Sequence, residues 1–215
     1  TIKASGYDSE RKVAKFAVSH FSMYAVGYNP VDFNDINMWA QNSIKYLAAR
    51  GIVSGIGNGS FEPYRNVTRA EFVKMLVGAL DDIELNTSGK SVFVDVPSGM
   101  WYTPYIIWAA ENKVVNGYGN GYFGPSDVIQ REQMAVMLSN FIKAIGLELP
   151  QEKEEQVFND QDQISAWARD AVKTIQKAGI INGKPGNIFD PKGNATRAEA
   201  AKVIEYVVKY LYMVE

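Results

Sequence analysis

The sequence predicts a mainly helical protein made of three helix-loop-helix repeats, with a short β-hairpin in front of them. Phe-x-Asp occurs three times, beginning at Phe33, Phe93 and Phe158, and a tryptophan and then an arginine follow each copy. The tryptophan and the arginine are 30 residues apart in all three copies, and a shared unit of structure is the simplest cause of that spacing. These pairs are Trp39 and Arg69, Trp101 and Arg131, and Trp167 and Arg197.

The first helix of each repeat is expected just after the tryptophan. In the first copy it is predicted over about residues 39–50, because Ile44 and Leu47 recur at helical spacing. Gly51 is placed as a left-handed stop at the end of this helix, and Gly179 holds the same place in the third copy.

The second helix of each repeat is expected to begin at a capping box, in which a hydroxyl and a carboxylate each bind an otherwise unpaired backbone N–H. The boxes are Thr68-x-x-Glu71 and Thr196-x-x-Glu199, and Gln130-x-x-Gln133 keeps only half of the pattern. One helix pair of about 60 residues buries too little surface to be stable alone, so the three copies are expected to share a core. Periodicity leaves open whether they stack as a solenoid or close around a pseudo-threefold axis.

The first 29 residues differ in pattern from the repeats. Residues 13–21 and 23–28 are interpreted as two short strands around His20, and as the last hairpin of a preceding β-domain, so the chain is expected to be a piece of a longer protein. The predicted organisation is residues 1–29 for the hairpin, and 30–91, 92–156 and 157–215 for the three repeats, which fold as one unit.

Composition excludes several function classes. A net charge of −2 gives no support for binding to nucleic acid or to an anionic membrane surface, and no apolar run approaches the length of a membrane span. Cysteine is absent, and the single histidine, His20, lies outside the repeats, which excludes the usual nucleophile-histidine pairs and multi-histidine zinc sites. No catalytic residue, cofactor or metal is predicted, although weak calcium binding at Asp160 and Asp162 stays open.

Three arginines, Arg69, Arg131 and Arg197, stand at the first position of the second helices, where the helix dipole disfavours a cation and favours an anion. Their recurrence suggests that an anion is held there by the guanidinium group and the helix N-terminus together. The alternative is an internal salt bridge from each arginine to Asp35, Asp95 or Asp160 or to a neighbouring glutamate.

Aromatic and acidic residues of the same repeats are candidate sugar contacts. Trp39, Trp101 and Trp167 can offer flat apolar faces to sugar rings, whereas a place in the core is the alternative. Asp35, Asp95 and Asp160 can accept hydrogen bonds from sugar hydroxyls, whereas helix N-caps are the alternative. Glycine-rich turns that include Gly59 and Gly121 can let a ligand approach the backbone closely, and they lack the strand-turn-helix context of a nucleotide site.

The combined motif resembles the S-layer homology repeat over about residues 30–215: Phe-x-Asp, Trp, a helix ending near Gly-Ile, Gly-x-Gly-x-Gly-x-Phe-x-Pro and Thr-Arg-Ala-Glu. The resemblance implies a pseudo-trimeric domain with a central three-helix bundle and three prongs. It also implies a cell-wall anchor, outside the cell at the C-terminal end of its parent, that binds secondary wall polysaccharide carrying pyruvate ketals on N-acetylmannosamine in grooves between the prongs.

By position, the resemblance makes the three arginines the anion contacts, the three aspartates and three tryptophans the sugar face, and Gly59 and Gly121 the points of close backbone approach. Gln130 in place of threonine and Asn187 in place of glycine predict weaker second and third grooves. The alternative function is a helical scaffold for assembly with neighbouring surface-layer subunits. A wall-glycan hydrolase would need two carboxylates in a cleft, which the sequence does not offer.

Overall fold

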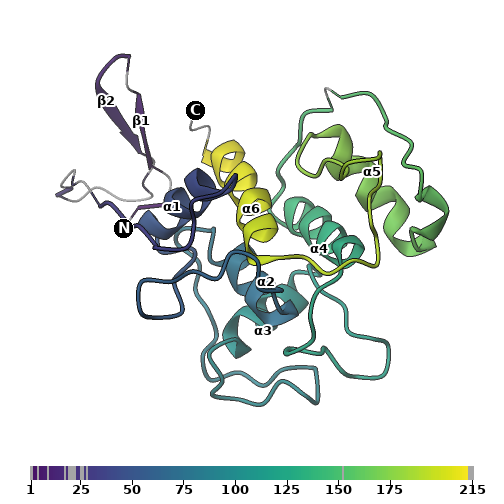
Figure 1. Ribbon diagram of the computed structural model, residues 1–215. Helices are drawn as coiled ribbons and strands as arrows, with labels where there is room; N and C mark the ends of the chain where they lie inside the picture. Colours follow the sequence, from purple (N-terminus) through teal and green to yellow (C-terminus); the bar gives the residue numbers. More distant parts are fainter. Residues whose placement is uncertain are drawn as a thin grey trace. The chain divides into compact units, whose positions relative to one another are not determined.

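The computed structural model describes residues 2–3, 5–8, 10–16, 18, 23–24, 27, 29–151 and 153–212. The described chain is mainly helical, with six α-helices, two short 3₁₀ helices and one small antiparallel hairpin (Figure 1). The helices are α1 Gln41–Ala49, α2 Arg69–Val77, α3 Thr103–Glu111, α4 Arg131–Ala144, η1 Gln161–Gln163, η2 Ala166–Ala168, α5 Arg169–Lys177 and α6 Arg197–Tyr212. The predicted helix pair is thus confirmed in each repeat.

The chain divides into two compact units that do not follow the repeat boundaries. Unit 1 is Thr1–Arg65, Gly78–Glu84 and Thr196–Glu215, and unit 2 is Asn66–Val77 and Leu85–Ala195. In unit 1, α1 of the first repeat packs on α6 of the third. In unit 2, α2 of the first repeat packs on α3 of the second, and α4 of the second packs on α5 of the third. Each second helix therefore buries its apolar face against the first helix of another repeat.

A ring of backbone hydrogen bonds in unit 2 joins the residues that lie two positions before the three arginines. Val67 N–H donates to the Ala195 carbonyl at 2.9 Å, Ala195 N–H to Ile129 at 3.0 Å, and Ile129 N–H to Val67 at 3.0 Å. All three residues are fully buried. Within unit 2 this ring therefore joins each repeat directly to the other two, and the direct bond between the first and third repeats is not expected in a linear stack.

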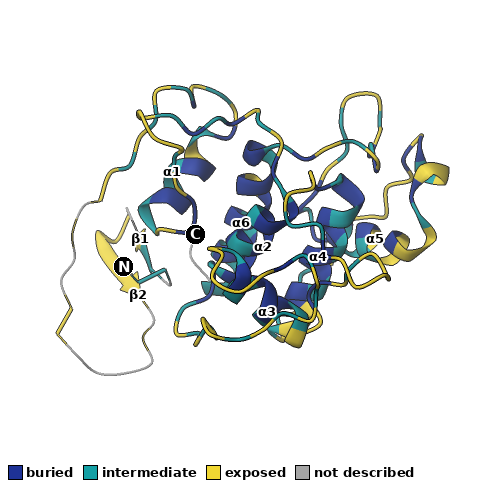
Figure 2. Ribbon diagram, turned by 90° about the horizontal axis from the view of Figure 1, so that it is seen from below, coloured by how far each residue is buried: buried dark blue, intermediate teal, exposed yellow. Residues whose placement is uncertain are grey.

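Figure 2 shows that buried and exposed residues share the same helices. Phe72 and Leu76 on α2 and Ile204 and Val207 on α6 are fully buried, as their helical spacing predicts. Gly51 and Gly179 end the first helices with φ of 70° and 74°, which confirms the predicted stops.

The N-terminal hairpin forms, and one strand lies within the predicted residues 13–21, but its partner strand was predicted wrongly at 23–28. β1, Ser5–Asp8, pairs antiparallel with β2, Val13–Phe16, with Ser5 opposite Phe16. The described residues of 23–28 are not in a strand, and His20 lies outside the described residues. The polar, glycine-containing sequence of β1 lacks the alternation that marks a half-buried strand, and the residues of β2 are exposed, so pattern alone did not identify the partner.

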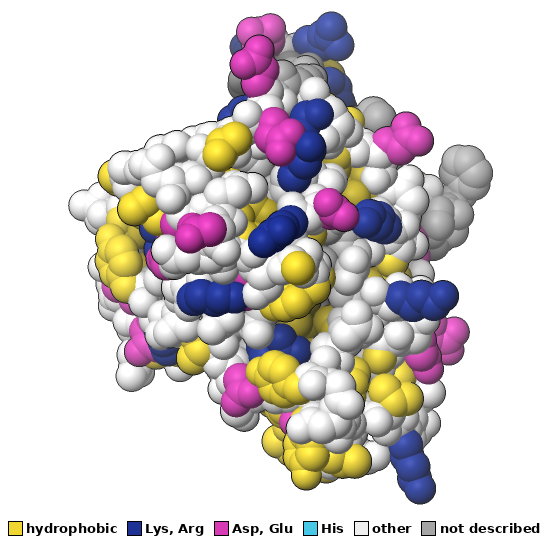
Figure 3. Space-filling view, turned by 90° about the vertical axis from the view of Figure 1, so that its right-hand side faces the viewer, with side chains coloured by type: hydrophobic (Ala, Val, Ile, Leu, Met, Phe, Trp, Pro, Cys, Tyr) yellow, Lys and Arg dark blue, Asp and Glu magenta, His cyan; other side chains and the backbone are white. Residues whose placement is uncertain are grey.

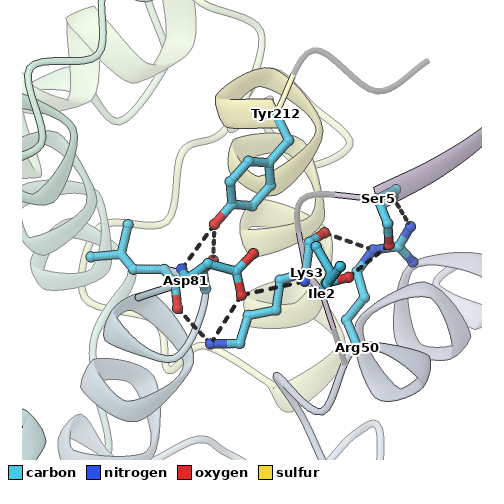
Figure 4. Close-up of polar contacts among 8 residues, drawn as sticks. Ile2, Lys3, Ser5, Arg50, Asp81 and Tyr212 are labelled. Atoms are coloured by element: carbon cyan, nitrogen blue, oxygen red, sulfur yellow. Dashed lines mark hydrogen bonds and ion pairs between the residues drawn. The ribbon is translucent and has the colours of Figure 1, made fainter. Parts of the chain in front are cut away.

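Polar contacts tie the base of the hairpin to the repeats within unit 1 (Figure 4). Lys3 donates through Nζ to the Leu80 carbonyl and through its backbone N–H to Asp81 Oδ1. Arg50 donates to the carbonyls of Lys3 and Ser5.

Tyr212 at the end of α6 donates to the Ala79 carbonyl at 2.9 Å and accepts from the Asp81 N–H at 3.0 Å. Burial raises the pKa of Tyr212 to about 12, so this phenol stays a donor.

Candidate functional site

Each Phe-x-Asp segment folds onto the glycine-rich turn of its own repeat through the aspartate. Asp35 accepts hydrogen bonds from the backbone N–H groups of Phe61 and Glu62 at 2.9 and 2.8 Å. Asp95 binds Phe123 and Gly124 in the same way, and Asp160 binds Phe189 and Asp190. Burial raises the pKa of Asp35, but these N–H donors outweigh it and hold that pKa below its ordinary value.

The aspartates thus hold the turn in place. Asp160 stands at the N-cap position of η1, but it makes no side-chain capping bond there. The N-cap of α1 is Ala40, five residues beyond Asp35, and it makes no side-chain capping bond. Because the oxygens of the aspartates bind backbone donors within each repeat, their immediate role is to shape the turn beside any ligand.

Aromatic pairs pack directly behind these turns. Phe33 and Phe61, Phe93 and Phe123, and Phe158 and Phe189 each place their ring centroids 5.4 Å apart. The first glycine of each turn is required by this packing: a Cβ on Gly55 would lie 2.6 Å from the Phe33 ring, and one on Gly117 would lie 2.8 Å from the Phe93 ring.

The last residue of each glycine-rich run has a left-handed backbone, with φ of 71° at Gly59, 85° at Gly121 and 56° at Asn187. The carbonyl of each accepts a hydrogen bond from the middle residue of Phe-x-Asp, at 2.8–2.9 Å. Asparagine is the non-glycine residue that best tolerates this conformation, so Asn187 preserves the turn in the third repeat. Gly59 and Gly121 as sites of ligand approach stay a prediction.

The three arginines reach across to another repeat. Arg69 donates through Nε to the Phe123 carbonyl, Arg131 to Phe189 and Arg197 to Phe61, at 2.8–2.9 Å. Each guanidinium also lies over the ring of the phenylalanine whose carbonyl it binds, with 4.3–5.4 Å between Cζ and the ring centroid. All three arginines are buried. The Nε hydrogen bonds thus go to backbone carbonyls of another repeat. Electrostatic interactions with the aspartates accompany them, between Arg69 and Asp95 and between Arg197 and Asp35.

The backbone N–H groups at the starts of the second helices are already bonded, so the expectation that they await an anion is wrong. In α2, Arg69 N–H donates to the Asp127 carbonyl at 2.9 Å and Ala70 N–H to the Pro125 carbonyl at 3.1 Å. The same two positions of α4 and α6 donate to carbonyls of the third and first repeats. An anion near these helices would therefore have to be bound by side chains.

The three tryptophans lie at the surface, which excludes the alternative of a place in the core. Trp39, Trp101 and Trp167 are 62%, 52% and 58% exposed. The Trp101 ring contacts Tyr102 edge-on and lies 5.7 Å from Lys74 Nζ. Each ring therefore offers a flat apolar face that a ligand or a partner can reach.

A pocket of about 420 Å³ in unit 2 brings Trp167 and Arg69 together. Arg69 comes from the start of α2 and Trp167 from η2, so residues far apart in the sequence line one site. The remaining lining comes from the loop after α3 and from one face of α4: Val114, Asn116, Gly117, Tyr118, Gln133, Val136, Met137 and Asn140.

The pocket has one cationic group, an apolar wall and several amides. Arg69 donates through Nη2 to the Asn116 carbonyl at 3.3 Å, and its guanidinium lies 4.7 Å from the Tyr118 ring centroid. Burial lowers the pKa of Arg69 below its ordinary value, which still leaves it protonated at neutral pH. Burial and the hydrogen bond to Asp127 raise the pKa of Tyr118, so its hydroxyl stays neutral. Such a site can take a carboxylate beside a small apolar group.

The wall formed by α4 was missed by sequence reasoning. Gln133, Val136, Met137 and Asn140 recur at intervals of three and four residues, which places them on one helix face. The signal was therefore present, but two amides within an otherwise apolar stripe do not by themselves show that the stripe faces a cavity.

The model for the S-layer homology domain matches residues 32–73, 92–135 and 157–201, more than half of the chain. The chain belongs to the S-layer homology family. The matched segments contain all three Phe-x-Asp sequences and all three arginines, as the motif predicts. Family membership places these S-layer homology repeats at the cell surface, associated with the wall, and supports a role in anchoring.

Several bacterial proteins are similar to this chain over part of their length. An amylopullulanase of Thermoanaerobacterium thermosulfurigenes is 41% identical over 92% of the chain and 10% of its own length. An exoglucanase, XynX, of Acetivibrio thermocellus is 42% identical over 81% of the chain and 16% of its own length. The S-layer protein sap of Bacillus anthracis is 34% identical over 77% of the chain and 20% of its own length. The chain thus spans a small part of each relative.

Two features of the described residues bear on other functions. In that part of the chain no helix has the length and apolar character needed to cross a membrane. The same residues hold no group of three or more His, Asp or Glu side chains placed to bind a metal ion.

We expect Asp160→Ala to destabilise the fold by about 2–4 kcal/mol, because the N–H groups of Phe189 and Asp190 would lose their acceptors in a buried turn. Urea unfolding followed by circular dichroism measures this loss. The matched control is Asp162→Ala, since Asp162 is exposed. Equal unfolding midpoints for the two variants would contradict the structural role of Asp160.

Proposed function

We propose that the chain is a non-catalytic anchor that attaches a bacterial surface protein to the cell wall. Its ligand is secondary wall polysaccharide with pyruvate ketals on N-acetylmannosamine, and the pocket of unit 2 is one binding site. The observation that carries the proposal is the meeting of buried Arg69 and exposed Trp167 in one pocket.

A pyruvate ketal carries a carboxylate and a methyl group on the same carbon. Arg69 offers a cationic partner for the carboxylate, and Val136 and Met137 on the adjacent wall offer apolar surface to the methyl group. The exposed ring of Trp167 is suited to the apolar face of the sugar, and the amide of Asn140 to an N-acetyl group or a hydroxyl. The chemical variety of the lining thus matches an acidic, acetylated sugar.

The relatives support the idea that this region is an anchoring module, separate from the parts of those proteins that carry out a reaction. The amylopullulanase and the exoglucanase align with this chain over only 10% and 16% of their lengths, and an S-layer protein carries a similar region. A region shared by proteins with such different names is best explained by a shared function, which is attachment to the cell wall. The surface that Figure 3 draws has basic and acidic side chains interspersed, in keeping with a local rather than a general electrostatic attraction.

Calorimetric titration with purified wall polysaccharide tests the proposal. We expect binding to the intact polymer and loss of binding once mild acid has removed the pyruvate. Equal binding to both polymers would contradict the pyruvate specificity. Binding to neither, together with concentration-dependent self-association, would favour the scaffold for protein assembly.

A further inference from the structure

The opening of α4 differs from those of α2 and α6 in the placement of one carboxylate. Both α2 and α6 begin with Arg-Ala-Glu after a threonine, whereas α4 begins with Arg131-Glu132-Gln133 after Gln130. The acidic residue has thus moved one position toward the N-terminus, and an amide stands in its former place. The contacts of Gln133 and Glu132 give each change a separate consequence.

Gln133 keeps the helix cap while placing no charge in the pocket. Its Oε1 accepts a hydrogen bond from Gln130 N–H at 3.2 Å, as Glu71 does from Thr68 and Glu199 from Thr196 at 2.8 Å. Gln133 also lines the pocket that holds Arg69. Among the ten described residues of that lining, Arg69 alone carries a formal charge.

The displaced carboxylate, that of Glu132, binds the segment that contains Trp167. Glu132 is 1% exposed and accepts hydrogen bonds from the N–H and the hydroxyl of Ser165, both at 3.0 Å, while Lys192 pairs with it. Ser165 is the N-cap residue of η2, which contains Trp167. Alanine occupies the position of Glu132 in α2 and α6.

We propose that Gln133 determines the charge preference of this pocket: a neutral amide in place of the carboxylate of the motif makes the pocket selective for a ligand with a carboxylate. The inference rests on the proposed function, from which it takes the ligand. A carboxylate at position 133 would share the pocket with the ligand carboxylate, and like charges at close range are strongly unfavourable. Glutamine at position 133 thus favours an acidic ligand, whereas the effect of Gln130 on the groove stays a prediction.

The test is Gln133→Glu, which preserves side-chain length and the acceptor for Gln130 N–H, so the fold is expected to persist with an unchanged thermal midpoint. The probes are pyruvylated N-acetylmannosamine and its neutral methyl ester, titrated by calorimetry at low and at high salt. We expect affinity for the acidic sugar to fall about tenfold at low salt and to recover in part at high salt. Affinity for the ester is expected to stay the same.

Gln151→Glu is the matched control, because it makes the same change in net charge at an exposed residue outside the pocket. Unchanged affinity of Gln133→Glu for the acidic sugar, or an equal loss in Gln151→Glu, would overturn the role of Gln133 alone. A wild-type chain that does not bind the acidic sugar would overturn the proposed function and this inference with it.

Discussion

Replacing Arg69, Arg131 and Arg197 with alanine is expected to unfold the chain at physiological temperature, and not only to abolish wall binding. The three residues are 3%, 4% and 8% exposed, and each binds a phenylalanine carbonyl of another repeat. Each loss leaves a buried acceptor without its donor and a void beside an aromatic ring, at a cost of about 2–4 kcal/mol. Three such losses approach the whole stability of a domain, about 5–15 kcal/mol.

Circular dichroism and thermal unfolding of the triple variant measure this effect, with each single variant as an intermediate step. Arg169→Ala is the control, since Arg169 is exposed and makes one hydrogen bond of 3.4 Å to the Ile164 carbonyl. A triple variant with a native spectrum and midpoint but no wall binding would show that the arginines serve the ligand alone.

The recurrence of the arginines was visible in the sequence, but their partners were not. Regular spacing identified the position, and the helix dipole suggested an anion. In the structure the N–H groups of that helix start bind carbonyls of another repeat, and Nε of Arg69 does the same. Contacts between repeats depend on how the copies close, and no periodicity within one copy contains that information.

Local features were predicted more completely than packing. The capping boxes of Thr68 and Thr196 form with both bonds, and Gln130 and Gln133 form a capping box as well. These contacts lie within four residues of sequence. The pairing of α1 with α6 joins the two ends of the repeat region, and sequence patterns show only that each helix has a face to bury. A central bundle of the three second helices stays a prediction.

The candidate site was predicted in part. The pocket of unit 2 contains Arg69 and Trp167 among the predicted ligand contacts, together with α4 side chains that were not predicted. The aspartates recur for a structural reason that spacing does not reveal, since their backbone partners lie 26–30 residues away. Residues that shape a site and residues that contact a ligand recur equally in a repeat, so recurrence alone does not separate them.

Trp167→Ala is expected to weaken binding of pyruvylated N-acetylmannosamine by about thirtyfold while leaving stability within about 0.5 kcal/mol of wild type. The ring is 58% exposed and lines the pocket, so its removal takes apolar surface from the ligand and little from the core. A loss of about 2 kcal/mol of contact corresponds to that factor. The single sugar is the right probe, because a polymer could bind to other grooves of the protein at the same time and so mask the loss of one site.

Two further variants sharpen the comparison. Trp167→Phe keeps an aromatic face and should retain most of the affinity, and Tyr7→Ala removes an aromatic ring that is 63% exposed on the hairpin and should change nothing. If Trp167→Ala bound the sugar as wild type does, the pocket of unit 2 would not be the sugar site. If Trp167→Ala instead unfolded readily, the ring would stabilise the fold and the assignment of Trp167 to ligand contact would be wrong.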